Sequence, residues 1–438
     1  MDNTRSRRVL LAAAGVAALA IPLAACSTGG GGESADGSVE ITFLVPTAGT
    51  NIESAEAMVA AFEKENDDIT VKVESQPAGT EGDNLMKTKL ATGEMADVFW
   101  YNSGSLFQAL NPDQNLAPLT DESWVGDMQD TMKAVVETDN GVYGAPFGAT
   151  QAGAVVYNKK IYADLGLEVP TSWDEFAANN DKIKAAGITP VIQTYGDTWT
   201  SQLFVLGDFG NVLAQDEDWG TEYTAGERKY VDEPALAGFA NQQEGFESGW
   251  WNEDFASALY DDGARMVATG EGAHYPILTG IVSTFQQNFP DQIDDIGVFP
   301  LPAQKAEDTK LTVWLPNAVY VPKTTEGAQL EAAKKFVAFI NSPAGCDVQN
   351  TAMVPSGPYA ISTCELGDDV PGLLKDMQVY FDEGNTNPAL EFLSPIKGPN
   401  LENITVEVGS GIRPAEDGAA LYDEDVKKQA QQLGLDGW

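Results

Sequence analysis

The sequence predicts an α/β protein of two lobes, in which each lobe is a mainly parallel sheet flanked by helices. Three observations support this fold class. The 438 residues exceed what one hydrophobic core usually serves. Apolar runs of strand length alternate with segments of helical periodicity, an order that requires parallel strands and right-handed connections. This pattern begins near Val39 and begins again after Phe147 with different residues.

The N-terminal segment carries signals for export and anchoring. Three arginines precede an apolar run over 9–21, which has the length of the hydrophobic region of a signal peptide. Leu-Ala-Ala-Cys follows at 23–26 and resembles a bacterial lipobox. We therefore expect residues 1–25 to be a lipoprotein signal peptide, Cys26 to be the lipid attachment site and 26–38 to be a flexible, glycine-rich tether. The alternative is an ordinary signal peptide that happens to contain a cysteine.

The first folded unit alternates strands and helices. The run 40–45 predicts a buried strand, and apolar residues recur at helical spacing over 55–62. Segment 69–73 then alternates with period two, 85–91 predicts a second helix, and 96–100 predicts a third strand. In such sheets ligands gather beyond the carboxyl ends of the strands, so we expect binding residues directly after these strands.

The second unit repeats the pattern. Segment 155–157 predicts a strand, and Ser172 with Glu175 forms a capping box for a helix that Gly187 ends. A further strand over 188–193 leads into the polar and aromatic stretch Thr194-Tyr195-Gly196-Asp197-Thr198-Trp199. Later segments add predicted helices and strands at 254–269, 272–276, 296–299, 313–321, 330–340 and 423–432.

Charge and cysteine usage limit the partners of the chain. With 66 acidic and 25 basic residues, its net charge of −41 disfavours nucleic acid, phospholipid headgroups and anionic substrates. Cys346 and Cys364 are the cysteines that remain after Cys26, and in an exported chain we expect them to form a disulfide. Two sulfurs and the single histidine, His274, are too few for a zinc site, so we expect no metal.

The motif inventory favours a binding protein over an enzyme. The sequence contains no G-x-S-x-G, G-x-x-x-x-G-K-[ST], G-x-G-x-x-G or C-x-x-C motif, and a single histidine excludes H-E-x-x-H. We therefore expect neither catalysis nor a cofactor. A secreted hydrolase that uses a pair of carboxylates stays open as an alternative, because acidic residues are abundant and their spacing singles out no pair.

Several stretches together carry a family resemblance that covers nearly all of the mature chain. They are the lipobox and tether, ADVFWYNSGS at 96–105, VVYNKKIYADLGLEVPTSWDEF at 155–176 and AAKKFVAFINSP at 332–343. In this order they resemble the carbohydrate-specific extracellular solute-binding proteins (family 1) of bacterial ABC transporters. The resemblance implies a periplasmic-binding-protein-like fold, with two lobes joined by hinge strands and sugar held in the cleft between them.

Sugar recognition requires particular side chains. Sugar ring faces lie on aromatic rings, and hydroxyl groups need planar donors and acceptors such as Asn, Asp, Glu and Gln. Four stretches offer both kinds: Trp100 with Asn102, Asp197 with Trp199, Trp250 and Trp251 with Asn252, and Trp314 with Asn317. The alternative for each tryptophan is packing in the core.

The resemblance supports some of these candidates. It implies that 100–103 and Asp197 with Trp199 contact sugar, and that Tyr275 lines the cleft; 314–317 lacks the paired glycines that the family often has there. We expect His274 to be structural. The candidate ligand-binding residues are Thr50, Glu81, Trp100, Asn102, Ser103, Asp197, Trp199, Trp251, Tyr275, Trp314 and Asn317.

The expected function is capture of a sugar, expected to be an oligosaccharide, and its delivery to the permease subunits of an ABC transporter. We expect a monomer held by its lipid on the outer face of the cell membrane of a Gram-positive bacterium. Lobe 1 is expected from 39–148 and 313–380, and lobe 2 from 149–312 and 381–438. A non-sugar solute, such as a peptide or polyamine, is the alternative ligand. The residue types do not identify the sugar, its linkage or its length.

Overall fold

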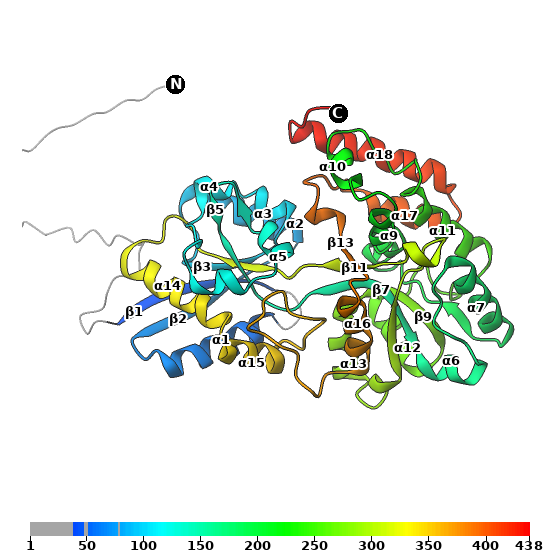
Figure 1. The fold of residues 1–438 in the computed structure, drawn as a ribbon, viewed down its shortest axis with the longest axis horizontal. Helices are drawn as coiled ribbons and strands as arrows, with labels where there is room; N and C mark the ends of the chain where they lie inside the picture. Colours follow the sequence, from blue (N-terminus) through cyan, green and yellow to red (C-terminus); the bar gives the residue numbers. More distant parts are fainter. Residues whose placement is uncertain (1–37, 48–50, 78) are drawn as a thin grey trace, which may run out of the picture.

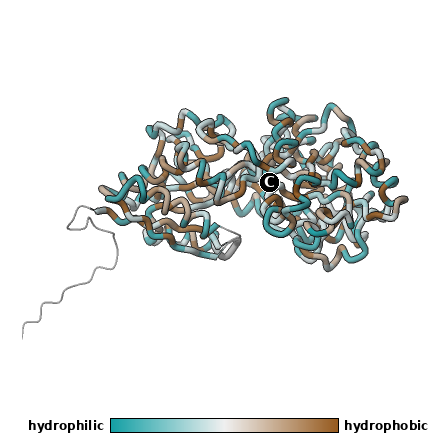
Figure 2. The backbone as a smooth tube through the Cα atoms, turned by 90° about the horizontal axis from the view of Figure 1, so that it is seen from below, coloured by the Kyte–Doolittle hydropathy of each residue, from teal (hydrophilic) through white to brown (hydrophobic). Residues whose placement is uncertain are grey.

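Two sheets organise the chain, one in each of two lobes that lie side by side (Figure 1). The structure is a computed structural model that describes residues 38–47, 51–77 and 79–438, without the side chains of residues 79–81. Viewed from below, the two lobes are joined at a narrower waist (Figure 2). Among the described residues, no helix is both long and apolar enough to cross a membrane.

The first lobe contains a five-stranded sheet. Its strands, in spatial order, are β2 (Ile69–Pro77), β1 (Val39–Thr47), β3 (Val98–Tyr101), β12 (Ala318–Tyr320) and β6 (Gly144–Pro146). The apolar side chains of β1 at Ile41, Phe43 and Val45 are fully buried, as the β-branched and aromatic composition of this run predicts.

Helices cover the first sheet with apolar faces of helical periodicity. α14 (Gly327–Ile340) buries Ala333, Phe336, Val337 and Ile340, and Phe336 meets Phe43 of β1 edge to face at 5.3 Å between ring centroids. The other helices of this lobe are α1 (Asn51–Glu65), α2 (Gly79–Thr92), α3 (Ser105–Gln108), α4 (Pro112–Asn115), α5 (Asp130–Ala134) and α15 (Pro343–Ala352). A two-stranded hairpin, β4 (Glu137–Thr138) with β5 (Gly141–Val142), completes it.

The second lobe contains a six-stranded sheet. Its path is β13 (Thr386–Pro388), β11 (Leu311–Trp314), β7 (Gln151–Asn158), β9 (Gly272–Leu278) and β8 (Thr189–Val191), and β10 (Ile296–Pro300) also pairs with β7. The helices around it are α6 (Lys159–Leu165), α7 (Trp173–Ala185), α8 (Leu203–Leu206), α12 (Tyr260–Thr269), α13 (Val282–Asn288) and α16 (Gly372–Asp382). The hydroxyl of Ser172 accepts from the amide of Glu175, and Gly187 follows α7 with a φ of 82°, so both ends of this helix match the sequence prediction.

Both sheets are mixed, which corrects the expectation of mainly parallel sheets. β1 pairs in parallel with β2 and β3, whereas β12 runs antiparallel to β3 and β6. In the second sheet β7 is antiparallel to β9, β10 and β11. For β12 beside β6 and β11 beside β7 the physical reason lies in the connections, because the strand by which the chain returns to a lobe or leaves it runs opposite to the strand of the earlier crossing.

A cluster of helices on the second lobe has its own apolar core, and the sequence reasoning predicted only its last member. Trp219, Tyr230 and Tyr422 are fully buried within this core. The cluster contains α9 (Phe209–Gln215), α10 (Trp219–Thr224), α11 (Leu236–Glu247), α17 (Leu401–Gly409) and α18 (Ala415–Gln432).

The chain passes between the lobes three times. The first crossing joins β6 to β7 through 147–150, the second joins β11 to β12 through 315–317, and the third joins α15 to α16 through 353–371. Main-chain hydrogen bonds hold the crossings together, from Phe147 N to Asn317 O (2.9 Å) and from Thr150 N to Pro358 O (2.9 Å).

The positions of the crossings favour lobe boundaries other than those expected at 313 and 380. β11 pairs with β7, and α16 packs against β10, so both elements lie with the second sheet. We therefore propose a division that assigns β11 and α16 to lobe 2 and ends the last segment of lobe 1 within the third crossing.

Candidate functional site

A cavity of about 410 Å³ lies between the lobes, at the crossings. Residues from all three crossings line it, together with side chains from each lobe. The volume lies in the usual range of small-molecule sites. A ligand in this cavity would touch both lobes and the segments that join them.

Trp100 comes from the end of β3 and lines the cavity from lobe 1. Its ring packs against Phe147 of the first crossing, with 4.6 Å between ring centroids, and only 5% of the residue is exposed. The indole Nε1 is buried and has no hydrogen-bond partner among the described residues. Trp124 and Trp219, which lie outside the cavity lining, also have a buried Nε1 without a partner among the described residues, so this feature is not specific to the cavity.

Trp314 stands at the end of β11 and lines the same cavity. Its ring lies against Gly153 of β7, where a Cβ atom would come within 2.5 Å of the ring atom Cζ3. Glycine at position 153 thus leaves room for the indole ring. The two tryptophans reach the cavity from different sheets.

Three side-chain amides supply hydrogen-bonding groups to the cavity. Asn102, Gln151 and Asn317 all line it and are partly exposed. Their side chains make no hydrogen bond to other described residues, so both their donors and their acceptors can meet ligand hydroxyl groups. The hydroxyl of Ser103 also lies at the cavity, but it donates to Pro316 O at 2.9 Å and so fixes the second crossing to lobe 1.

Glu391 and Phe392 line the cavity from the second lobe, and the sequence reasoning missed both. They belong to the short 3₁₀ helix Leu390–Phe392 that follows β13. Phe392 also packs against the core of lobe 1. The signal that could have found them is the pairing of a carboxylate with an aromatic residue, which is the same signal that singled out Asp197 with Trp199.

The expected pair Asp197 and Trp199 lies outside the cavity lining. The Trp199 ring packs on Tyr260, with 5.7 Å between centroids, and borders the core of the second sheet. The carboxylate of Asp197 accepts from the amide of Tyr260 at 2.7 Å, at the N-terminus of α12. The structure therefore gives both residues contacts that hold α12 in place.

Trp251 and Tyr275 also lie outside the cavity lining. The indole of Trp251 donates to Gly409 O at 2.9 Å, and its ring packs on Phe204. Tyr275 is 1% exposed, and its hydroxyl pairs with that of Thr194 at 2.8 Å. We do not carry these two residues into the proposed site, because their polar atoms already have partners within lobe 2.

His274 is structural, as expected. Its ring is fully buried, with Nδ1 2.8 Å from Asn180 Oδ1 and Nε2 2.8 Å from the hydroxyl of Tyr162. The amide oxygen of Asn180 can only accept, so Nδ1 donates and Nε2 accepts from Tyr162. Burial lowers the pKa of His274 to about 3, which keeps the ring neutral at physiological pH.

Three other expected residues cannot be placed at the site. Thr50 and Cys26 lie outside the described residues, and so does the side chain of Glu81. The disulfide predicted between Cys346 and Cys364 is present in the structure. The described residues contain no group of three or more His, Cys, Asp and Glu side chains that could hold a metal ion.

Comparisons with known proteins agree with this architecture. The model of a family described as bacterial extracellular solute-binding protein matches residues 48–345. The chain is 26% identical over 335 residues to the multiple sugar-binding protein of Streptococcus mutans serotype c, covering 73% of this chain and 75% of that one. It is 23% identical over 341 residues to the melibiose/raffinose/stachyose-binding protein MelE of Bacillus subtilis strain 168, covering 74% and 76%. A solved structure of a chitin oligosaccharide binding protein matches with a TM-score of 0.73 at 21% identity, covering 90% and 99%.

Proposed function

Because the chain belongs to the family of bacterial extracellular solute-binding proteins, we propose that it captures a neutral oligosaccharide between its lobes for an ABC transporter. The observation that carries the proposal is the cavity itself. Two indole rings from different lobes, Trp100 and Trp314, line it beside three side-chain amides that make no hydrogen bond to other described residues. Flat apolar surfaces next to unused donors and acceptors suit a sugar ring, which has C–H faces and a rim of hydroxyl groups.

The charge of the lining favours a neutral sugar. Among the described lining residues, Glu391 is the one carboxylate, and no lysine, arginine or histidine is present. An anionic sugar would therefore lose water without gaining a cationic partner, and Glu391 would repel it. The acidic surface of the whole chain adds to this repulsion.

The lining also supports binding without catalysis. Glycosidases use two carboxyl groups that flank the scissile bond, about 5–9.5 Å apart depending on the stereochemistry. Only Glu391 offers a carboxylate among the described residues that line the cavity. We therefore propose that the sugar leaves the protein chemically unchanged.

Delivery and location complete the proposal. We propose that lipid on Cys26 holds the protein at the outer face of the cell membrane and that the chain works as a monomer. The bound sugar passes from there to the permease subunits of an ABC transporter. The supporting observations are the lipobox-like sequence at 23–26 and the membership in an extracellular family.

A thermal-shift panel on the purified chain from residue 27 onward tests the ligand class. The panel contains raffinose, stachyose and a chitin oligosaccharide as neutral sugars, an oligogalacturonate as an anionic sugar, and a polyamine and a peptide as non-sugar solutes. At about 100 times its dissociation constant, a ligand adds roughly 2.7 kcal/mol to the free energy of unfolding. We expect stabilisation by at least one neutral sugar and none by the oligogalacturonate.

The same samples separate the proposal from its alternatives. Stabilisation by the polyamine or the peptide alone would show that the ligand is not a sugar. Chromatography of the bound sugar after incubation would reveal hydrolysis and so refute a pure binding role. Glu391→Gln should keep the neutral ligand within about tenfold of the parental affinity, because an amide keeps one acceptor and adds a donor.

A further inference from the structure

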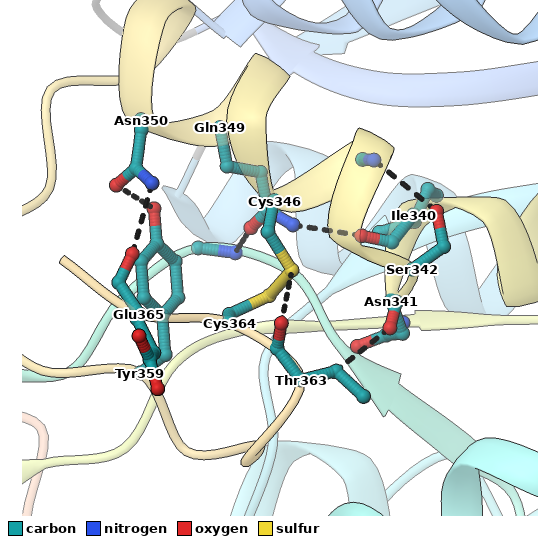
Figure 3. Close-up of a disulfide and its surroundings, with 12 residues drawn as sticks. Ile340, Asn341, Ser342, Cys346, Gln349, Asn350, Tyr359, Thr363, Cys364 and Glu365 are labelled. Carbon is teal, nitrogen blue, oxygen red and sulfur yellow. Dashed lines mark hydrogen bonds between the residues drawn. A yellow bond between two sulfur atoms is a disulfide. The ribbon is translucent and has the colours of Figure 1, made fainter. Parts of the chain in front are cut away.

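A disulfide closes a loop that includes the first part of the third crossing, and residues of this loop line the cavity. Cys346 in α15 is joined to Cys364, 18 positions further along the chain, and the loop between them contains five residues that line the cavity (Figure 3). We propose that this disulfide positions one wall of the ligand site, the segment Met353–Tyr359, and thereby sets the affinity for ligand. This inference rests on the proposed function.

The segment between α15 and Cys364 needs an external constraint. It has no helix or strand of its own, apart from an isolated bridge between Ile361 and Met128. Val354 adopts a φ of +51°, a backbone conformation that is a genuine outlier for a β-branched residue. Such a conformation persists only where surrounding structure enforces it. The covalent bond at Cys364 lies ten residues further along the same closed loop.

The segment is also hydrogen-bonded to the first crossing and to lobe 2. Thr150 of the first crossing donates from its hydroxyl to Pro358 O at 2.7 Å, and its carbonyl accepts from the hydroxyl of Ser356 at 3.0 Å. From lobe 2, the hydroxyl of Thr279 donates to Ser356 O at 2.7 Å. A displaced segment would therefore disturb both the cavity wall and the first crossing.

Hydrogen bonds tie the end of the segment to lobe 1. Gln129 donates from its side chain to Tyr359 O at 3.1 Å and from its backbone amide to Ala360 O at 3.0 Å. The hydroxyl of Tyr359 donates to Asn350 Oδ1 of α15 at 3.0 Å (Figure 3). A second, more open cavity of about 660 Å³ is lined by Tyr359 and Cys364. The disulfide adds a covalent link to these contacts and fixes the end of the closed loop relative to α15.

The consequence concerns affinity. A wall that is already ordered adds little entropic cost when a ligand binds, whereas a mobile wall must be ordered at that moment. Loss of the disulfide should therefore weaken sugar binding by roughly tenfold, on the scale of immobilising one or two side chains. A disulfide that only stabilised the folded state would leave the affinity of the folded protein unchanged.

The test compares the double variant Cys346→Ser/Cys364→Ser with the parent and with Ile183→Ala. Ile183 is a fully buried residue of α7 outside the cavity, so its truncation lowers stability without touching the wall. Amide hydrogen exchange is measured on the ligand-free proteins over 353–360 and 147–151. Dissociation constants are then measured for whichever of raffinose, stachyose and the chitin oligosaccharide binds the parent.

We expect the double variant to exchange faster over both segments and to bind the sugar roughly tenfold more weakly, while Ile183→Ala changes neither. Unchanged exchange over 353–360 would overturn the inference. Faster exchange with parental affinity would also overturn it. If the double variant does not fold, the parent treated with dithiothreitol replaces it, with reoxidation as the rescue. A parent that binds none of the sugars would refute the proposed function. Amide hydrogen exchange over 353–360 would still decide whether the disulfide positions this segment.

Discussion

Trp100 combines extensive burial with an unused hydrogen-bond donor. Its ring is held by Phe147, so the ring contributes to the core of lobe 1 as well as to the cavity. Truncation to alanine would therefore lower both stability and binding and could not separate the two roles. A smaller aromatic ring at position 100, compared with the same change at a matched position outside the cavity, separates the two roles.

We predict that Trp100→Phe weakens sugar binding about tenfold, because the smaller ring offers less surface to the sugar, and lowers the free energy of unfolding of the ligand-free protein about as much as Trp124→Phe does. Calorimetric titration and urea unfolding measure the two quantities. Trp124→Phe is the matched control, because Trp124 is equally buried in lobe 1, has an Nε1 without a partner among the described residues and lies outside the cavity. Parental affinity in Trp100→Phe would contradict a ligand contact at the indole ring.

The site was only partly predictable at the scale of single residues. Trp100, Asn102, Trp314 and Asn317 were found because each tryptophan has an asparagine within the next three residues behind it. Trp251 matched the same pattern, yet its indole donates to Gly409 O within lobe 2. An aromatic residue beside an amide can pack in a core as well as bind a sugar, so the local sequence does not distinguish a core residue from a site residue.

The N-terminus of α9 carries a carboxyl group that is costly to ionise. Asp208, directly before this helix, is 3% exposed and accepts one hydrogen bond, from Asn211 Nδ2 at 2.7 Å. Burial raises the pKa of Asp208 to about 8; the nearby charge of Glu233 adds to the increase and the bond from Asn211 opposes it. The folded protein therefore holds a proton there at neutral pH.

Because of this proton, the free energy of unfolding depends on pH. Between the unfolded-state pKa of 3.8 and the folded-state pKa of about 8, the folded protein binds more protons than the unfolded chain. Stability due to Asp208 is therefore full below pH 4 and declines as pH rises, by at most roughly 1.4 kcal/mol for each pH unit in this window. We predict that Asp208→Asn is less sensitive to alkaline pH, so that its stability relative to the parent rises between pH 5 and pH 8 by at most roughly 4 kcal/mol.

Urea unfolding at pH 5, 6.5 and 8 checks this prediction. Asp113→Asn is the control, because hydrogen bonds from Thr138, Tyr143 and Asn140 lower the pKa of Asp113 below 3.8. Its carboxyl group is ionised in both the folded and the unfolded states above pH 5, so its removal should shift stability equally at all three pH values. Equal shifts for Asp208→Asn as well would show that Asp208 is ionised in the folded protein.

Elements with a strong local signal were predictable, and elements defined by tertiary contacts were not. α14 and α7 have clear apolar periodicity or caps, and both are present. The helix α10 is six residues long and is ordered by the stacking of Trp219 on Tyr223 and by contacts with Tyr230. Nothing in six residues distinguishes such a helix from a loop, because most of its stability comes from packing.

At the scale of the whole molecule, the lobes touch across the mouth of the site. Phe392 of the second lobe packs against the core of lobe 1, directly above Gly104 at the start of α3. A Cβ atom at Gly104 would lie 2.8 Å from Glu391 O and 2.9 Å from Phe392 Cδ1. The close approach of the lobes therefore depends on the missing side chain at position 104.

Two lobes joined by hinge strands, as the sequence predicts, imply closure on the ligand. We expect closure to bring Phe392 and Glu391 over a ligand that rests on Trp100, with the change in backbone angles taken up by the three crossings. Trp199, expected from the sequence to contact sugar, lies outside the cavity lining, and Trp314 and Phe392 take its place in the proposed site.

We predict that Gly104→Ala keeps the lobes apart. The added methyl group meets a backbone oxygen and a packed ring at less than 3 Å, and neither can move aside without shifting the segment 390–392. Solution scattering should show a larger radius of gyration than in the parent, with a smaller decrease on adding sugar, and affinity should fall by tenfold or more. Gly93→Ala is the matched control: Gly93 also has a positive φ, of 73°, but its added Cβ would make only an ordinary contact of 3.7 Å, with Thr324. Both variants place a side chain at positive φ, but Gly104 also has a ψ of −135°, so urea unfolding of each variant measures the backbone cost separately from scattering and affinity. A radius of gyration and an affinity equal to those of Gly93→Ala would show that the approach of Phe392 to Gly104 has no part in holding the ligand.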